Sequence, residues 1–281
     1  LLHNYAEAGE PDFVAEAQET LIEKLPWLRC IVVKSRKAED SAERRGRISY
    51  GSSPDRKAKA QGIWFAVDLT MNRDASLYLD TANLRLWAMA SLKGKSVLNA
   101  FAYTGSLGVA ALAGAASRVV QLDRNGAFLN VAKESCALNG FAISKGDYIA
   151  KDFFPAVAQF KRSGQRFDCV FLDPPFFSST GLGRVDQCGE CVRLVNKVRP
   201  LVNDGGWLVA INNALFLKGQ EYMAALEALC ADGYLSIESL IPVSEDCVGY
   251  ASTQRGFLPA DPAPFNHATK IAILRVRRKF A

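Results

Sequence analysis

The spacing of apolar residues along the chain changes at about residue 80. Before that point, apolar residues recur at helical spacing from Phe13 to Leu25 until Pro26 stops the helix, and two short apolar runs at 30–33 and 63–69 are typical of strands. Glycines, serines and a proline between residues 46 and 54 mark turns. Residues 1–75 therefore predict a small, β-rich accessory region that carries a loop.

From about residue 80 onward, apolar runs that are typical of strands alternate with helical segments. The expected strands are 96–101, 118–123, 148–150, 167–172 and 207–212, and the expected helices are 84–92, 107–113, 127–138, one from about 155, one around 189–198, and 220–230. Two late strands, 235–241 and 271–276, have no helix signal between them. Residues 76–281 therefore predict an α/β domain with a doubly wound, Rossmann-like sheet that is mostly parallel.

One stretch, from Ser96 to Ser117, contains no charged residue and is long enough to cross a bilayer. Because Asn99, Thr104 and Gly105 lie inside it, a buried strand, a glycine turn and a buried helix explain it better. The first ten residues are polar and acidic, and they do not resemble a signal peptide. These features favour a cytoplasmic protein with no membrane partner.

The chain has seven scattered cysteines, and their odd number indicates reduced thiols rather than a disulfide framework. Cys188 and Cys191 form one C-x-x-C pair, but no other cysteine or histidine stands at a spacing that would complete a zinc site. We therefore expect no metal, and we expect both thiols to lie on the next helix.

Basic residues are concentrated in the accessory region. The segment from Lys34 to Lys59 holds nine basic and four acidic residues, so its charge of 9 − 4 = +5 equals that of the whole chain. A clustered basic segment is typical of a protein that binds a polyanion such as RNA. Arg44, Arg45 and Arg47 are the candidate contacts, and a solvated loop is the alternative.

Ligands of open α/β sheets bind beyond the carboxyl ends of the strands. The loop after the first strand lacks the full glycine fingerprint, because Phe101 and Tyr103 interrupt it, so an NAD-dependent oxidoreductase is disfavoured. A glycine turn at a helix N-terminus still suits a ligand carboxylate. Asp123 ends the second strand, 123 − 105 = 18 residues after Gly105, which is close to the offset of a ribose-binding acid. A helix cap is the alternative interpretation of Asp123.

The later strand ends carry further polar and aromatic side chains. Asp152 follows the third strand and is a candidate acceptor for an adenine amino group, or else a helix cap. The fourth strand ends in the sharpest motif, Asp173-Pro174-Pro175-Phe176, in which the prolines fix the backbone. Its carboxylate can accept an N–H of a planar amine while the aromatic ring stacks on it. Asn212 and Asn213 end the fifth strand, and their amides either bind a base edge or satisfy the turn.

The Asp173–Phe176 motif resembles that of amino-methyltransferases that act on nucleic-acid bases. Together with Leu79-Asp80 and the run from Asn99 to Gly105, it resembles the bacterial large-subunit rRNA methyltransferases over about residues 63–279. That family has guanine-N7 and cytosine-C5 branches. Ala82 stands where the family has an arginine, and Arg85 is the candidate replacement. The resemblance implies a class I fold with S-adenosylmethionine as cofactor, and these cofactor-binding residues: Asp80, Arg85, Asn99, Phe101, Tyr103, Thr104, Gly105, Asp123 and Asp152.

We therefore predict an enzyme that transfers a methyl group from S-adenosylmethionine to a base nitrogen, in ribosomal RNA. Its predicted catalytic residues are Asp173, Pro174, Pro175 and Phe176, and its predicted substrate-binding residues are Phe177, Asn212, Asn213 and the three arginines. The enzymatic alternatives are a methyltransferase of protein amides or small molecules, and a cytosine-C5 RNA methyltransferase, which requires a cysteine where asparagines stand. The non-enzymatic alternative is an RNA-binding protein that kept the fold.

Overall fold

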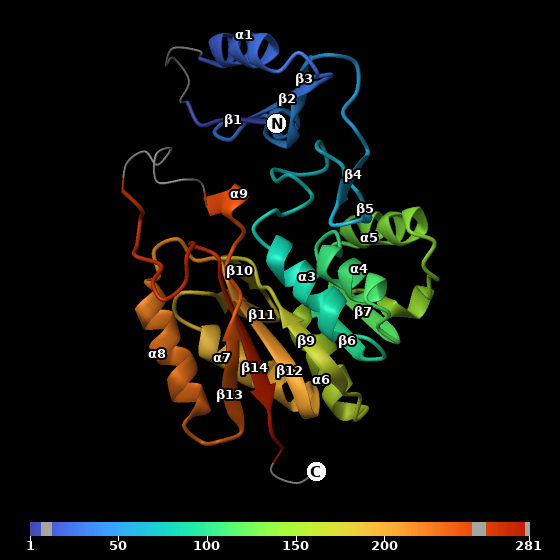
Figure 1. Cartoon of the computed structure of the whole chain (residues 1–281), viewed down its shortest axis with the longest axis vertical. Helices are drawn as coiled ribbons and strands as arrows, with labels where there is room; N and C mark the ends of the chain where they lie inside the picture. The colour runs from blue at the N-terminus through green and yellow to red at the C-terminus, as the bar shows by residue number, and fades with distance from the viewer. Residues whose placement is uncertain (7–12, 249–256, 279–281) are drawn as a thin grey trace. The chain divides into compact units, whose positions relative to one another are not determined.

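The computed structural model describes residues 1–6, 13–248 and 257–278, and the chain divides into two compact units, Leu1–Tyr78 and Leu79–Ala281 (Figure 1). The first unit contains a three-stranded sheet of order β1-β2-β3 and a separate hairpin of β4 and β5. Its elements are β1 (Leu2–Asn4), α1 (Val14–Lys24), β2 (Ile31–Ser35), α2 (Ser41–Arg45), β3 (Arg47–Tyr50), β4 (Lys57–Ala60) and β5 (Ile63–Ala66).

The prediction of a basic loop is only partly right, because the segment from Lys34 to Lys59 contains the end of β2, α2, β3 and most of β4 as well as the turns between them. Asp40 caps α2 by accepting a hydrogen bond from the Ala42 amide. The following strand β3 pairs antiparallel with β2. Seven of the segment's thirteen charged residues therefore sit on α2 or on strands, and the other six lie in the turns between these elements.

The second unit is built on a seven-stranded sheet of order β13-β14-β12-β9-β6-β7-β8. The strands β12, β9, β6, β7 and β8 run parallel, and β14 is antiparallel to both β12 and β13. The predicted doubly wound α/β fold is confirmed. The strands are β6 (Ser96–Ala100), β7 (Arg118–Asp123), β8 (Tyr148–Ala150), β9 (Phe167–Leu172), β12 (Val202–Asn212), β13 (Leu235–Leu240) and β14 (Lys270–Val276).

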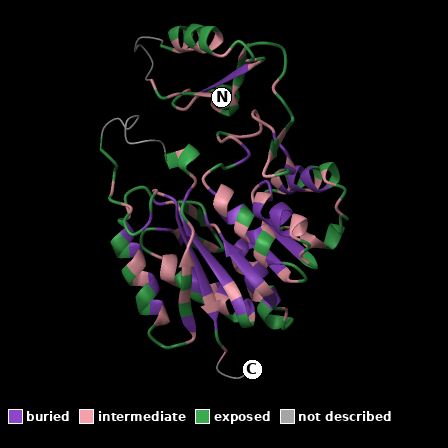
Figure 2. Ribbon diagram, viewed as in Figure 1, coloured by how far each residue is buried: buried purple, intermediate pink, exposed green. Residues whose placement is uncertain are grey.

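Helices cover both faces of this sheet, and Figure 2 shows the buried strands between them. One layer contains α3 (Ala82–Ser91), α4 (Ser106–Ala113) and α5 (Gly126–Leu138), and the other contains α6 (Phe153–Arg162), α7 (Cys191–Val198) and α8 (Gly219–Cys230). Because both faces are covered, β6 is buried at four consecutive positions, Val97 to Ala100. The uncharged stretch from residue 96 to 117 is thus β6, a turn and α4, as predicted. None of the described helices is both long and apolar enough to span a bilayer.

Three features of the second unit differ from the sequence prediction. A hairpin of β10 (Phe177–Thr180) and β11 (Gly183–Asp186) follows β9, and a short helix, α9 (Glu245–Val248), lies between the late strands. Strand β12 begins at Val202 rather than at Trp207, and its register with β9 shifts between those two residues. Gly205 lies in this irregular stretch with a φ of 67°, so the turn-like sequence around it concealed the start of the strand.

Candidate functional site

The loop after β6 has a backbone conformation that residues other than glycine rarely adopt. Phe101 and Tyr103 have φ values of 59° and 51°, and Gly105, at the N-terminus of α4, has 77°. The neighbouring strand stabilises this conformation, because the Tyr103 amide donates to Asp123 Oδ2 at 2.8 Å. The other oxygen of Asp123 accepts the Asn125 amide at 2.8 Å. Asn125 itself caps α5, so Asp123 is not the cap of that helix.

Buried amides support the loop from beneath. Asn99 donates to Gln121 Oε1 at 2.8 Å, and Gln121 donates onward to the Gly105 carbonyl at 3.2 Å. Thr104 is buried as well. Gly108 leaves room for this network, since a Cβ there would lie 2.1 Å from Gln121 Nε2. The geometry therefore gives Asn99 a supporting position below the loop.

Asp152 occupies the N-cap of α6. Its side chain accepts the Phe154 amide at 3.0 Å and the Thr180 hydroxyl at 3.1 Å. The ring of the buried Phe153 stacks on that of Phe101, with 4.5 Å between the centroids. The structure therefore supports the interpretation of Asp152 as a helix cap.

The Asp173–Phe176 segment extends from the carboxyl end of β9, directly beside the loop after β6. The Asp173 amide donates to the Ala100 carbonyl at 3.5 Å, which joins the two strand ends. Pro174 is buried, while Phe176 is 46% exposed. Desolvation, together with the negative charge of Asp80, raises the pKa of Asp173 to about 7. This carboxyl group therefore changes its protonation state near neutral pH.

Sequence reasoning missed the residue that holds this segment in place, the buried Gln187. Its side-chain amide donates to the Pro174 carbonyl, and its backbone amide donates to the Phe176 carbonyl at 3.1 Å. On its other side, Gln187 Oε1 accepts the Asn213 amide at 2.7 Å and its backbone carbonyl accepts Asn212 Nδ2 at 2.9 Å. The β10–β11 hairpin returns the chain to this position, and nothing in the local sequence indicates it.

Two acceptor atoms at this edge of the sheet are buried and receive no hydrogen bond from the described residues: Asp80 Oδ1 and Asn213 Oδ1. The other oxygen of Asp80 accepts the Thr269 hydroxyl at 2.6 Å. A buried acceptor without a donor costs about 1–3 kcal/mol. Such atoms are therefore candidates for contacts with a ligand that offers N–H groups.

Two cations near these acceptors are buried. Arg85, in α3, donates to the Thr81 hydroxyl at 3.0 Å, and burial lowers its pKa while the charge of Asp80 opposes that shift. Lys270 donates to the carbonyls of Ala214 and Ala268 at 2.9 and 2.5 Å, and burial lowers its pKa to about 8. Lys270 thus fixes the loop that follows Asn213.

The two cysteines of the C-x-x-C pair are not both on a helix, which corrects the sequence prediction. Cys191 begins α7, but Cys188 precedes it, is exposed, and directly follows Gln187. It therefore lies close to the ends of β9 and β12. Partial desolvation, together with the negative charge of Asp186, raises the pKa of the Cys188 thiol. All seven cysteines belong to the described residues and are free.

The three predicted RNA-binding arginines belong to the first unit. The Arg44 guanidinium donates to the carbonyls of Ala38 and Glu39, both at 2.6 Å, whereas Arg45 and Arg47 are exposed. Much of the surrounding basic segment is also engaged within the unit. Lys34 is buried and donates to the carbonyls of Asn72 and Asp74. The described residues contain no cluster of histidines, cysteines and carboxylates that could hold a metal.

Comparison with known proteins assigns the chain to a family. The sequence matches the S-adenosylmethionine-dependent methyltransferases over residues 28–239, and the chain belongs to that family. The predicted class of S-adenosylmethionine-dependent methyltransferases and its cofactor are thereby confirmed. The structure of SMU.776 in complex with SAH is similar, with a TM-score of 0.79 at 18% identity over 94% of this chain and 67% of that one, which supports the fold.

Among curated relatives, the chain is similar to ribosomal RNA large subunit methyltransferase I of Aeromonas hydrophila. The two are 32% identical over 180 residues, which cover 63% of this chain and 45% of that protein. The protein of the same name from Photobacterium profundum is 30% identical over 218 residues, covering 72% of this chain and 55% of that protein. The chain therefore spans about half the length of the curated relatives that it matches.

Proposed function

We propose that this chain transfers a methyl group from S-adenosylmethionine to a nitrogen of a base in RNA, with ribosomal RNA as the substrate. The observation that carries the proposal is the hydrogen bond from the Asp173 amide to Ala100. It brings the candidate acceptor segment directly beside the loop that begins at Phe101. The names of the similar proteins, which are ribosomal RNA methyltransferases, support RNA as the substrate.

The residues of the β6 and β7 ends fit the cofactor. The Asp123 carboxylate accepts the amides of Tyr103 and Asn125, one on each oxygen, and a weaker contact from the Arg124 amide, so it still has a lone pair for a ribose hydroxyl. The turn from Phe101 to Gly105 ends at the N-terminus of α4, where a carboxylate is favoured. The buried Asp80 Oδ1 is an acceptor for the cofactor ammonium group. When it is bound, S-adenosylmethionine supplies a methyl group already activated by the adjacent sulfonium.

The residues of the β9 and β12 ends fit a planar base that carries N–H groups. Asp173 accepts an N–H of the base in its ionised form, and the exposed ring of Phe176 stacks on the base. The buried Asn213 Oδ1 accepts a second N–H. Pro174 and Pro175 fix the direction of the segment, and Asn212 holds Gln187 beside it. Positioning of the two reactants supplies most of the acceleration in such a transfer.

We further propose that residues 1–75 act as an accessory RNA-binding region. Arg45 and Arg47 are exposed and make no ion pair within the described residues, so they remain available for phosphate groups. Arg44 contributes less, because its guanidinium is bound to two carbonyls of its own turn.

The test is methyl transfer from radiolabelled S-adenosylmethionine to total RNA, followed by digestion to nucleosides and mass spectrometry. We expect an N-methylated nucleoside from the wild-type chain and almost none from Asp173→Asn. Label recovered in 5-methylcytidine, or in protein instead of RNA, would overturn the proposal.

A further inference from the structure

Two lysines on different helices of the second unit repel each other electrostatically and have no carboxylate partner among the described residues. Lys161 is in the last turn of α6 and Lys197 in the last turn of α7. Neither forms an ion pair with a carboxylate of the described residues. Burial and the charge of Lys197 lower the pKa of Lys161. Since like charges brought together by a fold destabilise it, a bound anion would relieve this repulsion.

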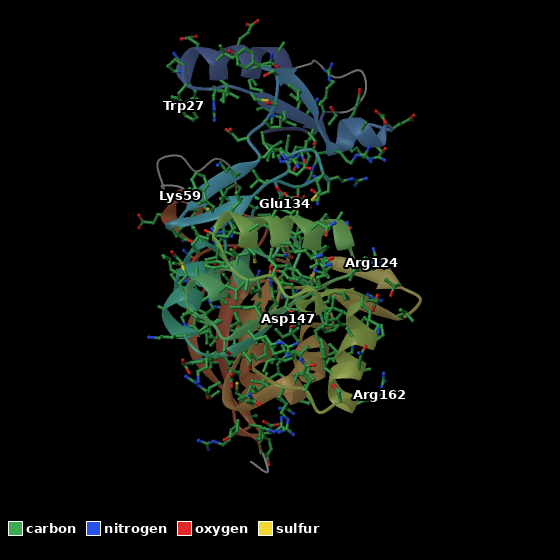
Figure 3. The ribbon with its side chains drawn as sticks, turned by 90° about the vertical axis from the view of Figure 1, so that its right-hand side faces the viewer. Trp27, Lys59, Arg124, Glu134, Asp147 and Arg162 are labelled. Carbon is green, nitrogen blue, oxygen red and sulfur yellow. The ribbon has the colours of Figure 1, made fainter. Side chains whose placement is uncertain are left out.

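Lys197 and Arg193 lie beside one aromatic ring, that of Phe154. Lys197 Nζ lies 5.6 Å from the centroid of the Phe154 ring, and Arg193 Cζ lies 5.5 Å from it. The neighbouring Arg162 ends α6 and is exposed (Figure 3). An aromatic ring surrounded by cations is typical of surfaces that bind nucleic-acid strands.

A continuous series of contacts connects the Phe154 ring and its two cations with the candidate acceptor segment. Gly183, in β11, lies against the Phe154 ring, since a Cβ on it would come within 2.2 Å of a ring carbon. Arg193 donates to the Arg184 carbonyl at 2.5 Å. The Arg184 guanidinium lies 5.4 Å from the centroid of the Phe177 ring, and Phe177, which directly follows Phe176, is 56% exposed.

We infer that the RNA strand adjoining the methylated base runs from Phe177 along the β10–β11 hairpin to the ends of α6 and α7. The inference rests on the proposed function and adds to it a route for the strand. Phe177 offers a face for stacking the neighbouring base, while Lys197 and Lys161 bind phosphate groups. We call this surface the α6–α7 path and define it by Phe177, Arg184, Arg193, Lys197 and Lys161.

The chemistry of the path favours a single strand. Arg184 and Arg193 each have an acidic partner, Asp186 at 2.5 Å and Glu190 at 2.7 Å, so the uncompensated charge is that of the two lysines. A few phosphate contacts combined with an exposed ring fit a strand whose bases are unpaired, because the bases of a duplex cannot stack on a side chain.

The test compares two variants with equal charge changes, Lys161→Gln/Lys197→Gln and the control Lys93→Gln/Lys145→Gln, whose lysines are exposed elsewhere on the second unit. Binding of a labelled single-stranded RNA of about 16 nucleotides is measured by fluorescence anisotropy at several salt concentrations. The path variant should bind several-fold more weakly, and the slope of its log affinity against log salt should fall by about 1.4, since two phosphate contacts are lost. The control should bind as the wild type does.

Calorimetry with S-adenosylmethionine should give wild-type affinity for both variants, which distinguishes the loss of an RNA contact from a damaged fold. Equal weakening by the path and control variants would overturn the route, as would competition by polyglutamate as effective as that by RNA. If the path variant bound RNA more weakly as expected but the wild-type chain methylated no RNA, the proposed function would fail, while the α6–α7 path would remain an RNA-binding surface. Unchanged RNA binding by the path variant would refute the route alone.

Discussion

Gln187 donates its side-chain amide to the carbonyl oxygen of Pro174 and so joins the segment after β9 to the end of β12. The two residues are separated by the entire β10–β11 hairpin. Because Gln187 is buried and uses its amide N–H, its amide oxygen and its backbone, it couples the position of Asp173 and Phe176 to that of Asn213. The geometry of the candidate acceptor site therefore depends on a residue that is assigned no contact with a reactant.

Replacing Gln187 with leucine should lower both stability and turnover. The Pro174 carbonyl and the Asn213 amide would each lose a partner in a buried place, at about 1–3 kcal/mol for each group. We expect a lower midpoint of thermal unfolding and a kcat reduced at least tenfold, with nearly unchanged affinity for S-adenosylmethionine. The control is Gln220→Leu, at an exposed position in α8. A wild-type kcat in a folded Gln187→Leu variant would show that the hydrogen bonds of Gln187 do not help to position Asp173 and Phe176.

Asp123→Ala should weaken the binding of S-adenosylmethionine by about 1–3 kcal/mol in calorimetry, because ribose hydroxyls would lose their acceptor. The Tyr103 amide would also lose its partner, so thermal stability should fall as well. Asp123→Asn, which keeps one oxygen acceptor, should have the smaller effect on both. If stability fell while cofactor affinity stayed at the wild-type value, Asp123 would serve only to hold the loop.

The carboxyl group of Asp173 should make both stability and activity depend on pH near neutrality. Its pKa is about 7 in the folded protein and about 3.8 in an unfolded chain. Between these values only the native state keeps the proton, so the free energy of unfolding should fall as pH rises through this window. Asp173→Asn cannot ionise. Its advantage in thermal stability should be largest above about pH 7 and should shrink towards pH 4.

Activity should change in the opposite direction, because the ionised form of Asp173 accepts the N–H of the base. The kcat/KM of the wild-type chain should rise with pH and level off above about 7. A wild-type profile that is flat between about pH 5 and pH 8 would remove Asp173 from the acceptor site.

The fold was predictable from the sequence because burial on both faces makes parallel strands apolar throughout, as in β6 and β9. The position of Asp173 was predictable as well, because it directly follows the apolar strand β9. Gln187 could not be predicted, because its partners are set by a hairpin whose Ser178-Ser179-Thr180-Gly181 sequence is typical of a turn. The basic segment was misjudged for a related reason, because charge does not show that Lys34 is buried against backbone carbonyls.

The position and pKa of one cysteine bear on whether the chain methylates a nitrogen or a carbon of the base. Carbon-5 of cytosine is a poor nucleophile, so its methylation requires a thiolate that first adds to the ring. Cys188 lies near the ends of β9 and β12, immediately after Gln187, and is exposed. The pKa of its thiol is nevertheless raised by partial desolvation and by the charge of Asp186, and the charge of Lys270 only partly opposes that shift. An unactivated thiol favours the nitrogen assignment.

We therefore predict that Cys188→Ser and Cys191→Ser, singly or together, retain methyl transfer within about tenfold of the wild-type rate, since a thiol with no covalent role contributes only through packing. RNA that contains 5-fluorocytosine should form no covalent adduct with the wild-type chain in denaturing electrophoresis. Asp173→Asn, assayed in parallel, should be nearly inactive. It shows how far activity falls when the contact between the carboxylate and the base is lost. A trapped adduct that disappears in Cys188→Ser, or a folded but inactive Cys188→Ser variant, would assign the chain to cytosine-carbon methylation instead.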